Sequence, residues 1–330
     1  MRGLLTGAAL GVAAVAALAG ILIALPWETD VTFGMDRNTT HDEDPYESNS
    51  DISSRHTRES FFFPCNGVRC HAWLYLPRCT PRDALGVASD EPTGDGNAPL
   101  LTRGPMAPPP VVLMAHGMGG TKDHKLDHIG AEIADAGYAA LLFDYRFWGG
   151  SDGLPRHVLS PKAQLEDYEA AVQHVKASGG LGRKCDPDRV VLWGTSYSGG
   201  HSLVTAAKMG ANISAVIAMV SAPAVRTHVT SVLEAGGTKN LILCRIVWEY
   251  LNYAPLDSVE KVKVPTLLIA GLQDDLTPAA GIQAAAERMT DAKYIPLDGT
   301  HISLYGNAGL VPAMVGFLKD RVPLRSGTVA

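Results

Sequence analysis

The apolar residues of this chain fall into one long N-terminal run, followed after a polar stretch by short apolar runs that alternate with amphipathic ones. The short apolar runs lie at residues 111–115, 138–145, 189–194, 215–221, 264–271 and 293–299. Amphipathic stretches that predict helices lie at 123–137, from Ser160-Pro161 onward, and at 199–209, 278–289 and 308–320. Buried strands separated by amphipathic helices predict an α/β fold, with a mostly parallel sheet that helices cover on both faces.

Local signals refine two of these elements. Residues 59–77 predict a β-hairpin, because they place two strand-like runs on either side of Asn66-Gly67, a strong turn signal. In the helix at 123–137 we expect Asp123 as the N-cap and Gly137 as the stop. The apolar face of that helix consists of Leu126, Ile129 and Ile133.

The N-terminal apolar run, residues 3–25, contains no charged residue. About 20 apolar residues suffice to cross a bilayer, so we expect a transmembrane anchor. Arg2 precedes the run, and positive residues stay on the cytoplasmic side, which places the body of the chain in a lumen or outside the cell. A cleaved signal peptide followed by secretion is the alternative, with Ala17-Leu18-Ala19 as the cleavage site.

These patterns divide the chain into an N-terminal segment, a linker and one folded domain. The expected parts are an anchor or signal peptide at 1–27, a polar linker at 28–58, a domain at 59–322 and a tail at 323–330. Within the domain, residues 80–110 are rich in Pro, Gly, Asp and Ala and predict an exposed insertion. Residues 223–263 interrupt the alternation and are long enough for a small cap.

The composition narrows the class of protein. The chain is 46% hydrophobic and 19% charged, which is enough apolar material for a packed core. Its net charge is −6 without a run of Lys or Arg, which argues against nucleic acid as a partner. Of the five cysteines, Cys65 and Cys70 flank the predicted turn, where they either form a disulfide or remain two thiols.

Ser196 is the candidate nucleophile. It follows the strand at 189–194 by two residues and precedes a helix, in the segment Gly194-Thr-Ser-Tyr-Ser198. A sharp strand-to-helix turn of this kind exposes the serine hydroxyl and demands small neighbours. Ser198 stands where the pattern usually has a second glycine, and its small side chain fits the same requirement.

A serine hydroxyl needs a base, and the base needs a carboxylate. His301 follows the last predicted strand, and Asp274 follows the strand before it, with Asp275 as the rival acid. The ends of parallel strands converge on one edge of the sheet. We therefore predict a triad in which His301 accepts the proton of Ser196 and Asp274 orients the imidazole.

The segment HGMGG, residues 116–120, follows the strand at 111–115. Its glycines let the backbone approach a substrate, so the N–H groups of Met118 and Tyr197 are the expected oxyanion hole. The segment fits neither glycine-rich phosphate-binding template. His124 and His128 have the spacing of two metal ligands on a helix, but no third ligand accompanies them, so we predict neither a metal nor an organic cofactor.

At this point the chain resembles the α/β-hydrolase family over residues 59–322. The stretches that carry the resemblance are HGMGGTKD, LLFDYRFWGGSDG, LWGTSYSGGHS, LIAGLQDDLTP and DGTHIS. It is most similar to the dienelactone-hydrolase and serine-aminopeptidase-like groups, and the resemblance extends to a branch of fungal polyketide acyl transferases. It implies an eight-stranded, mostly parallel sheet and Ser-His-Asp hydrolysis, and the spacing of its acid loop favours Asp274 over Asp275.

The resulting hypothesis is a serine hydrolase that cleaves a small or medium carboxylic ester, or a thioester or amide, through an acyl-serine. An acyltransferase with the same triad is one alternative, and a non-catalytic binding protein on the same scaffold is another. Tyr145, Phe147 and Trp148 are assigned either to the acyl pocket or to the core.

Overall fold

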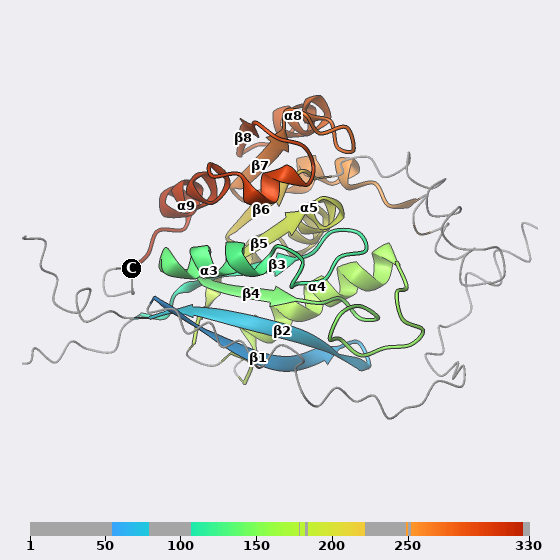
Figure 1. The fold of residues 1–330 in the computed structure, drawn as a ribbon, viewed down its shortest axis with the longest axis vertical. Coiled ribbons are helices and arrows are strands. Elements are labelled where there is room, and N and C mark those ends of the chain that lie inside the picture. Colours follow the sequence, from blue (N-terminus) through green and yellow to red (C-terminus); the bar gives the residue numbers. More distant parts are fainter. Residues whose placement is uncertain are drawn as a thin grey trace, which may run out of the picture.

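A computed structural model describes residues 55–78, 107–177, 179–181, 184–221, 249 and 252–325. Its strands form one eight-stranded sheet in the order β1-β2-β4-β3-β5-β6-β7-β8 (Figure 1). The strands are β1 His56–Cys65, β2 Val68–Pro77, β3 Pro110–Ala115, β4 Ala139–Phe143, β5 Asp186–Thr195, β6 Ala215–Met219, β7 Thr266–Gly271 and β8 Ala292–Leu297. The pairs β1–β2 and β2–β4 are antiparallel, and every other pair is parallel. The predicted mostly parallel, eight-stranded sheet is therefore confirmed.

Helices cover both faces of the sheet. They are α3 Asp127–Asp135, α4 Pro161–Lys176, α5 Tyr197–Met209, α8 Ala279–Glu287 and α9 Leu310–Arg321, with short 3-10 turns at Gly210–Asn212, Pro255–Asp257, Val259–Lys261 and Ser303–Gly306. One buried cluster joins the sheet to α3 and α9, and a second joins it to α4, α5 and α8. Each face thus has its own core.

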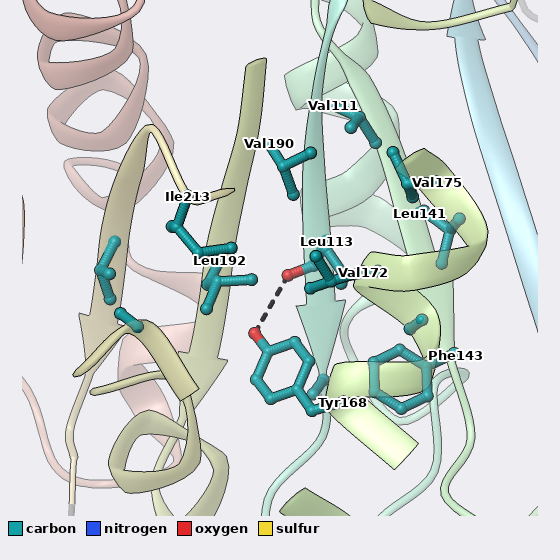
Figure 2. Packing of buried hydrophobic residues seen from close by; sticks show 14 of the residues in the cluster. Val111, Leu113, Leu141, Phe143, Tyr168, Val172, Val175, Val190, Leu192 and Ile213 are labelled. Atoms are coloured by element: carbon teal, nitrogen blue, oxygen red, sulfur yellow. Dashed lines mark hydrogen bonds between the residues drawn. The ribbon is translucent and has the colours of Figure 1, made fainter. Parts of the chain in front are cut away.

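The strand β3 shows why its sequence is apolar at every position. Val111 and Leu113 contribute to the core beneath α4 and α5, whereas Val112 and Met114 point to the core beneath α3 and α9. Figure 2 shows the first of these cores, where the hydroxyl of the buried Tyr168 donates to the carbonyl of Leu113. A strand buried on both faces needs no polar alternation, so its run of apolar residues is continuous.

The first helix begins later than its sequence pattern predicts. We expected Asp123 as the N-cap, but α3 starts at Asp127, because Lys125 has a φ of +64° and interrupts the helical path. The Asp123 side chain instead accepts a hydrogen bond from the Thr121 hydroxyl within a turn. The expected stop is confirmed: Gly137, with a φ of +97°, follows the end of α3.

The predicted hairpin is confirmed. Asn66 and Gly67 connect β1 to β2, and both have positive φ values, +44° and +91°. This combination is typical of the two-residue turns that match the twist of antiparallel strands. Cys65 and Cys70 flank the turn and are joined by a disulfide, so the paired form of the two alternatives is the one observed.

The membrane prediction requires a correction. Its segment, residues 3–25, lies outside the described residues, as does the polar linker as far as residue 54. Within the described part of the chain, no helix combines the length and apolar character that a bilayer crossing needs. The longest, α4, has 16 residues and carries charges, whereas a crossing takes about 20 apolar residues. The predicted single-pass membrane localisation, with a lumenal or extracellular catalytic domain, is therefore withdrawn.

Only some of the other predicted boundaries fall within the described residues. Residues 80–106 of the predicted insertion at 80–110, and residues 223–248, 250 and 251 of the predicted cap at 223–263, lie outside the described residues. The described core starts with β1 at His56 and reaches the end of α9 at Arg321, close to the expected domain limits of 59 and 322. The division into domains remains a prediction.

Candidate active site

Ser196 occupies a strained turn between β5 and α5. It has a φ of +54° and a ψ of −118°, and its N–H donates to the Met219 carbonyl at 2.8 Å. A residue other than glycine with positive φ costs roughly 1–3 kcal/mol, which the surrounding structure must compensate. This backbone conformation directs the side chain of Ser196 away from β5 and α5.

The close packing of this turn explains the small residues around it. A Cβ added at Gly194 would lie 2.0 Å from the carbonyl oxygen of Ser198, and one added at Gly199 would lie 2.6 Å from the Cβ of Ser221. Neither space accommodates a side chain. The glycines are thus required by the backbone contacts of the turn.

Ser198 does more than satisfy the demand for a small residue. Its fully buried hydroxyl accepts from the Thr195 N–H at 2.8 Å and lies 2.7 Å from the Ala115 carbonyl, to which it donates. Ala115 ends β3, directly before the predicted oxyanion segment. The side chain therefore ties the turn of Ser196 to the strand that carries this segment.

Replacing Ser198 by alanine is expected to lower the free energy of unfolding by about 1–3 kcal/mol, because it leaves a buried N–H and a buried carbonyl without their partner. Denaturant titration would measure the loss. Ser258→Ala, at a half-buried serine without a side-chain hydrogen bond among the described residues, is the matched control. If both variants unfold alike, the Ser198 hydroxyl has no such role.

Three side chains from separate loops meet at the carboxyl edge of the sheet. The Nε2 atom of His301 lies 2.8 Å from the Ser196 Oγ, and its Nδ1 atom lies 2.7 Å from the Asp274 Oδ2. Asp274 follows the end of β7, and His301 follows the end of β8. The structure thus brings together the three residues predicted as a triad.

The Asp274 carboxylate is held by four hydrogen bonds. Its Oδ1 accepts from the N–H groups of Leu276 and Thr277, at 2.8 and 2.9 Å. Its Oδ2 accepts from the Thr277 hydroxyl at 2.7 Å and from His301. Burial opposes ionisation, but the hydrogen bonds from Thr277 and His301 outweigh it and lower the pKa of Asp274. The rival acid, Asp275, is exposed to solvent.

Our sequence analysis did not identify Thr277, although a signal was present. A threonine three residues after an aspartate is a common turn pattern, in which the carboxylate accepts from the backbone and the hydroxyl of the later residue. Here that pattern fixes the orientation of the Asp274 carboxylate toward His301.

The segment at 116–120 lies against Ser196. A Cβ added at Gly117 would lie 3.2 Å from the Ser196 Cβ, so only a glycine permits this approach without displacement. The Nδ1 of His116 lies 2.9 Å from the Gly117 carbonyl, its other nitrogen faces the Tyr145 N–H at 3.5 Å, and burial lowers its pKa. The neutral imidazole therefore braces the segment.

The residues predicted for the oxyanion hole lie near the nucleophile. Met118 and Tyr197 line the same cavity as Ser196 and His301. Tyr197 is the first residue of α5, and N–H groups in the first turn of a helix point out of its N-terminus. The assignment of these two N–H groups to an oxyanion remains a prediction.

A buried ion pair that the sequence analysis missed stabilises this region. The carboxylate of Asp144 accepts from the N–H and the ammonium of Lys122, both at 2.7 Å, and from the Gly150 N–H at 2.9 Å. Burial opposes ionisation, but Lys122 outweighs it and lowers the pKa of Asp144. A Cβ at Gly149, whose φ is +50°, would lie 2.2 Å from a carboxylate oxygen. The pair links the loop after β3 to the loop after β4.

A cavity of about 330 Å³ opens beside Ser196 and has a mostly apolar lining. The lining residues are His116, Gly117, Met118, Gly120, Thr121, His124, Lys125, Leu126, Ser196, Tyr197, Leu276, Thr277, His301, Ile302 and Tyr305. Tyr145, Phe147 and Trp148 are not among them. Tyr145 and Phe147 are buried in the core, so the core assignment is the one observed for both.

The structure does not bring the two candidate metal ligands together. The His128 Nε2 lies 2.9 Å from the Tyr305 carbonyl, and His124 faces the cavity. Within the described ranges, the potential ligands that cluster are Cys65, Cys70 and Asp167. A metal is bound by a cysteine thiolate. Because both cysteines are joined in the disulfide, neither sulfur is a free thiolate for a metal.

His201 on α5 is fully buried in a polar network. Its Nδ1 lies 2.5 Å from the Tyr253 hydroxyl, and its Nε2 lies 3.1 Å from the Gln164 side-chain oxygen. Burial, together with the nearby His116, lowers the pKa of His201 to about 3. The imidazole therefore stays neutral in the folded protein and anchors residues 252–255 to the helix that follows Ser196.

This network predicts a pH-dependent stability. Unfolded histidine binds a proton near pH 6.5, whereas folded His201, with a pKa of about 3, does not. The unfolded state then binds more protons, so the free energy of unfolding falls as the pH drops below about 6.5, by up to about 1.4 kcal/mol per pH unit. Denaturant titrations at pH 7, 6 and 5 would measure the slope.

The variant His201→Gln is expected to flatten this slope by about one proton. His124→Gln, at an exposed position, is the matched control, because solvent reaches its ring in both states. An equal slope in His201→Gln and the unaltered protein would contradict the prediction.

Comparisons with known proteins add three observations to this geometry. The family described as serine aminopeptidase, S33, matches residues 107–248. The quorum-quenching protein AidA of Acinetobacter baumannii is 39% identical over 145 residues, which are 44% of this chain and 38% of that protein. The thiohydrolase aneE of Aspergillus aculeatus is 35% identical over 94 residues, which are 28% of each chain. This chain therefore spans well under half the length of both curated relatives.

The likeness to a solved structure covers more of the chain than the family match does. The Pyrococcus furiosus esterase superposes with a TM-score of 0.58 at 15% identity, over 81% of this chain and 91% of its own. At this identity the likeness concerns the fold.

Proposed function

We propose that this chain, whose fold is that of the α/β-hydrolases, is a serine hydrolase acting on carboxylic esters or thioesters. Ser196 is the nucleophile, His301 the general base and acid, and Asp274 the residue that orients the imidazole and stabilises its cation. No metal or organic cofactor takes part in this proposal. The amide bond is a further possible target of the same chemistry.

The proposed reaction has two halves. The Ser196 hydroxyl adds to the substrate carbonyl while His301 Nε2 takes its proton, and the carbonyl oxygen becomes an oxyanion facing the N–H groups of Met118 and Tyr197. The oxyanion collapses, His301 protonates the departing alcohol or thiol, and an acyl-Ser196 remains. A water then adds to this acyl group with His301 as base, and its collapse releases the acid and restores Ser196.

One observation carries the proposal: an unbroken chain of hydrogen bonds runs from the Ser196 Oγ through His301 to Asp274, at 2.8 and 2.7 Å. It starts at a serine held with a φ of +54°. Backbone strain costs free energy, and a strained serine with a base within proton-transfer distance is typical of an active site.

The ester or thioester class rests on the cavity and on the relatives. Its mostly apolar lining suits a moderately hydrophobic acyl group or alcohol. One relative carries the name thiohydrolase, and a protein of the same fold carries the name esterase. Esters and thioesters share the carbonyl that Ser196 attacks, so one triad serves both.

A fluorophosphonate probe tests the proposal, because it reacts with an activated serine and not with a structural one. We expect labelling of the full chain, loss of labelling in Ser196→Ala, and hydrolysis of short-chain nitrophenyl esters by the unlabelled protein, which labelling abolishes. An unlabelled but folded protein would support the non-catalytic binding alternative. Product analysis with an added alcohol separates the acyltransferase alternative, which predicts a new ester in place of the free acid.

A further inference from the structure

Among the described residues that line the cavity, Lys125 is the one with a cationic side chain, apart from the histidines. Apart from it and three histidines, the side chains of the lining residues are uncharged, and no aspartate or glutamate is among them. Lys125 is exposed, and it forms no ion pair among the described residues. A cation without a partner beside an apolar cavity suits an anionic group of a ligand.

The acidic residues next to Lys125 in the sequence do not neutralise it in the cavity. Asp123 accepts a hydrogen bond from the Thr121 hydroxyl, and one oxygen of Asp127 lies 3.7 Å from the His128 Nδ1. Neither carboxylate lines the cavity. Both aspartates therefore have other partners, and the exposed Lys125 lies at the solvent-facing side of the cavity, called its mouth below.

The backbone at Lys125 supports a role for its side chain. Its φ of +64° lies in the left-handed region, where glycine and asparagine are tolerated best. The Lys125 N–H donates to the Asp123 carbonyl at 2.9 Å, and the His124 N–H donates to the Thr121 carbonyl at 3.0 Å. These bonds fix the strained turn. A lysine at a position that favours glycine or asparagine points to a function of the ammonium.

The remainder of the mouth is apolar. Met118, Leu276 and Ile302 are large apolar residues that are 39%, 56% and 55% exposed, and all three line the cavity. Single exposed apolar side chains are ordinary, but three around one cavity form an apolar surface for a ligand. A substrate that fits this mouth has an apolar body and one anionic group.

We propose that Lys125 binds a free carboxylate of the substrate, so that the enzyme prefers esters or thioesters carrying one negative charge beside an apolar chain. This inference rests on the proposed function. A single ammonium matches the single charge of a carboxylate, whereas a phosphate is usually held by several donors. His124, which also lines the cavity, offers a ring nitrogen next to the ammonium.

Two pairs of matched esters test the inference on the full chain. The first pair is the 4-nitrophenyl monoester of glutaric acid and the corresponding terminal amide, which differ in charge on the acyl side. The second pair is the butyrate ester of 4-hydroxybenzoate and that of 4-hydroxybenzamide, which differ in charge on the leaving group. We expect kcat/KM to favour the carboxylate in at least one pair by about tenfold, the scale of one hydrogen bond to a charged group.

The variant Lys125→Gln is expected to abolish this preference through a higher KM for the charged ester, with kcat and the neutral ester unchanged. Lys125→Asn should lose the same preference without a lower melting temperature, because asparagine tolerates positive φ. Lys319→Gln removes the same charge from an exposed position on α9 and should leave the preference intact. Added salt should weaken the preference in the unaltered protein.

Equal rates for both members of each pair, or an equal loss for both in Lys125→Gln, would overturn the inference. These outcomes are distinct from failure of the proposed function. If Ser196→Ala keeps its labelling and hydrolysis, or if no ester is cleaved at all, the serine-hydrolase proposal fails and the inference falls with it. Cleavage that depends on Ser196 without charge preference rejects the role of Lys125 alone.

Discussion

Ser196→Ala is expected to lower kcat for ester hydrolysis by about 10⁶-fold, the scale on which hydrolases lose activity when a nucleophilic serine is removed. The reason is that, among the described residues, the Ser196 Oγ is the hydroxyl that the His301 Nε2 contacts, at 2.8 Å, so the base has no other hydroxyl from which to take a proton. KM should change little, because the cavity beside the turn keeps its shape. Steady-state kinetics with a nitrophenyl ester, on protein purified free of host esterases, would measure the loss.

Variants of His301 provide the control, because Ser196 and His301 are expected to act together in the same step. His301→Ala should cost about as much as Ser196→Ala, and the double variant should cost no more than either, because the residues act as one unit. Thermal unfolding of Ser196→Ala should stay close to that of the unaltered protein, since alanine is as strained at positive φ as serine. Residual activity above about one per cent of the unaltered rate would contradict the assignment of the nucleophile.

Asp274→Asn is expected to lower kcat by about 10⁴-fold, as in hydrolases whose triad carboxylate becomes an amide. The amide can present an NH₂ group to the His301 Nδ1, which favours the wrong tautomer, and it cannot stabilise the imidazolium. The N–H groups of Leu276 and Thr277, which donate to Oδ1, would hold the amide oxygen in place, so the geometry should survive. Kinetics and circular dichroism together separate a chemical loss from a folding defect.

The neighbouring aspartate provides a matched substitution. Asp275 is exposed and lies outside the hydrogen-bond chain, so Asp275→Asn should change kcat by less than about twofold. The two variants make the same chemical change one residue apart. A larger loss in Asp275→Asn than in Asp274→Asn would reverse the assignment of the acid.

The central strands were predictable because a strand that is buried on both faces has a continuous run of apolar residues. Residues such as Val111 to Ala115 are apolar without interruption, since each side chain enters one of two cores. The start of α3 was not predictable in the same way. Asp123 is a good N-cap by residue type, but the positive φ of Lys125 ends that possibility, and no residue preference signals a lysine in this conformation.

In the candidate site, too, some contacts could be predicted from the sequence and others depend on how distant loops pack. Ser196, Asp274 and His301 each follow a strand, and parallel strands place such positions on one edge, so their proximity follows from order along the chain. The pair of Lys122 and Asp144 depends instead on how two loops fold against each other, 22 residues apart. Sequence analysis had no period or spacing from which to infer that contact.

Both ends of the stretch between Ser221 and Asn252 are attached to the start of α5. Gly199 lies so close to Ser221 that a Cβ would stand 2.6 Å from it, and a Cβ at Gly200 would lie 2.7 Å from Pro255. Close contacts with α5 therefore fix the positions of Ser221, before this stretch, and of Pro255, after it. Changes confined to the residues between these two points should therefore leave the start of α5, and with it the position of Ser196, unaltered.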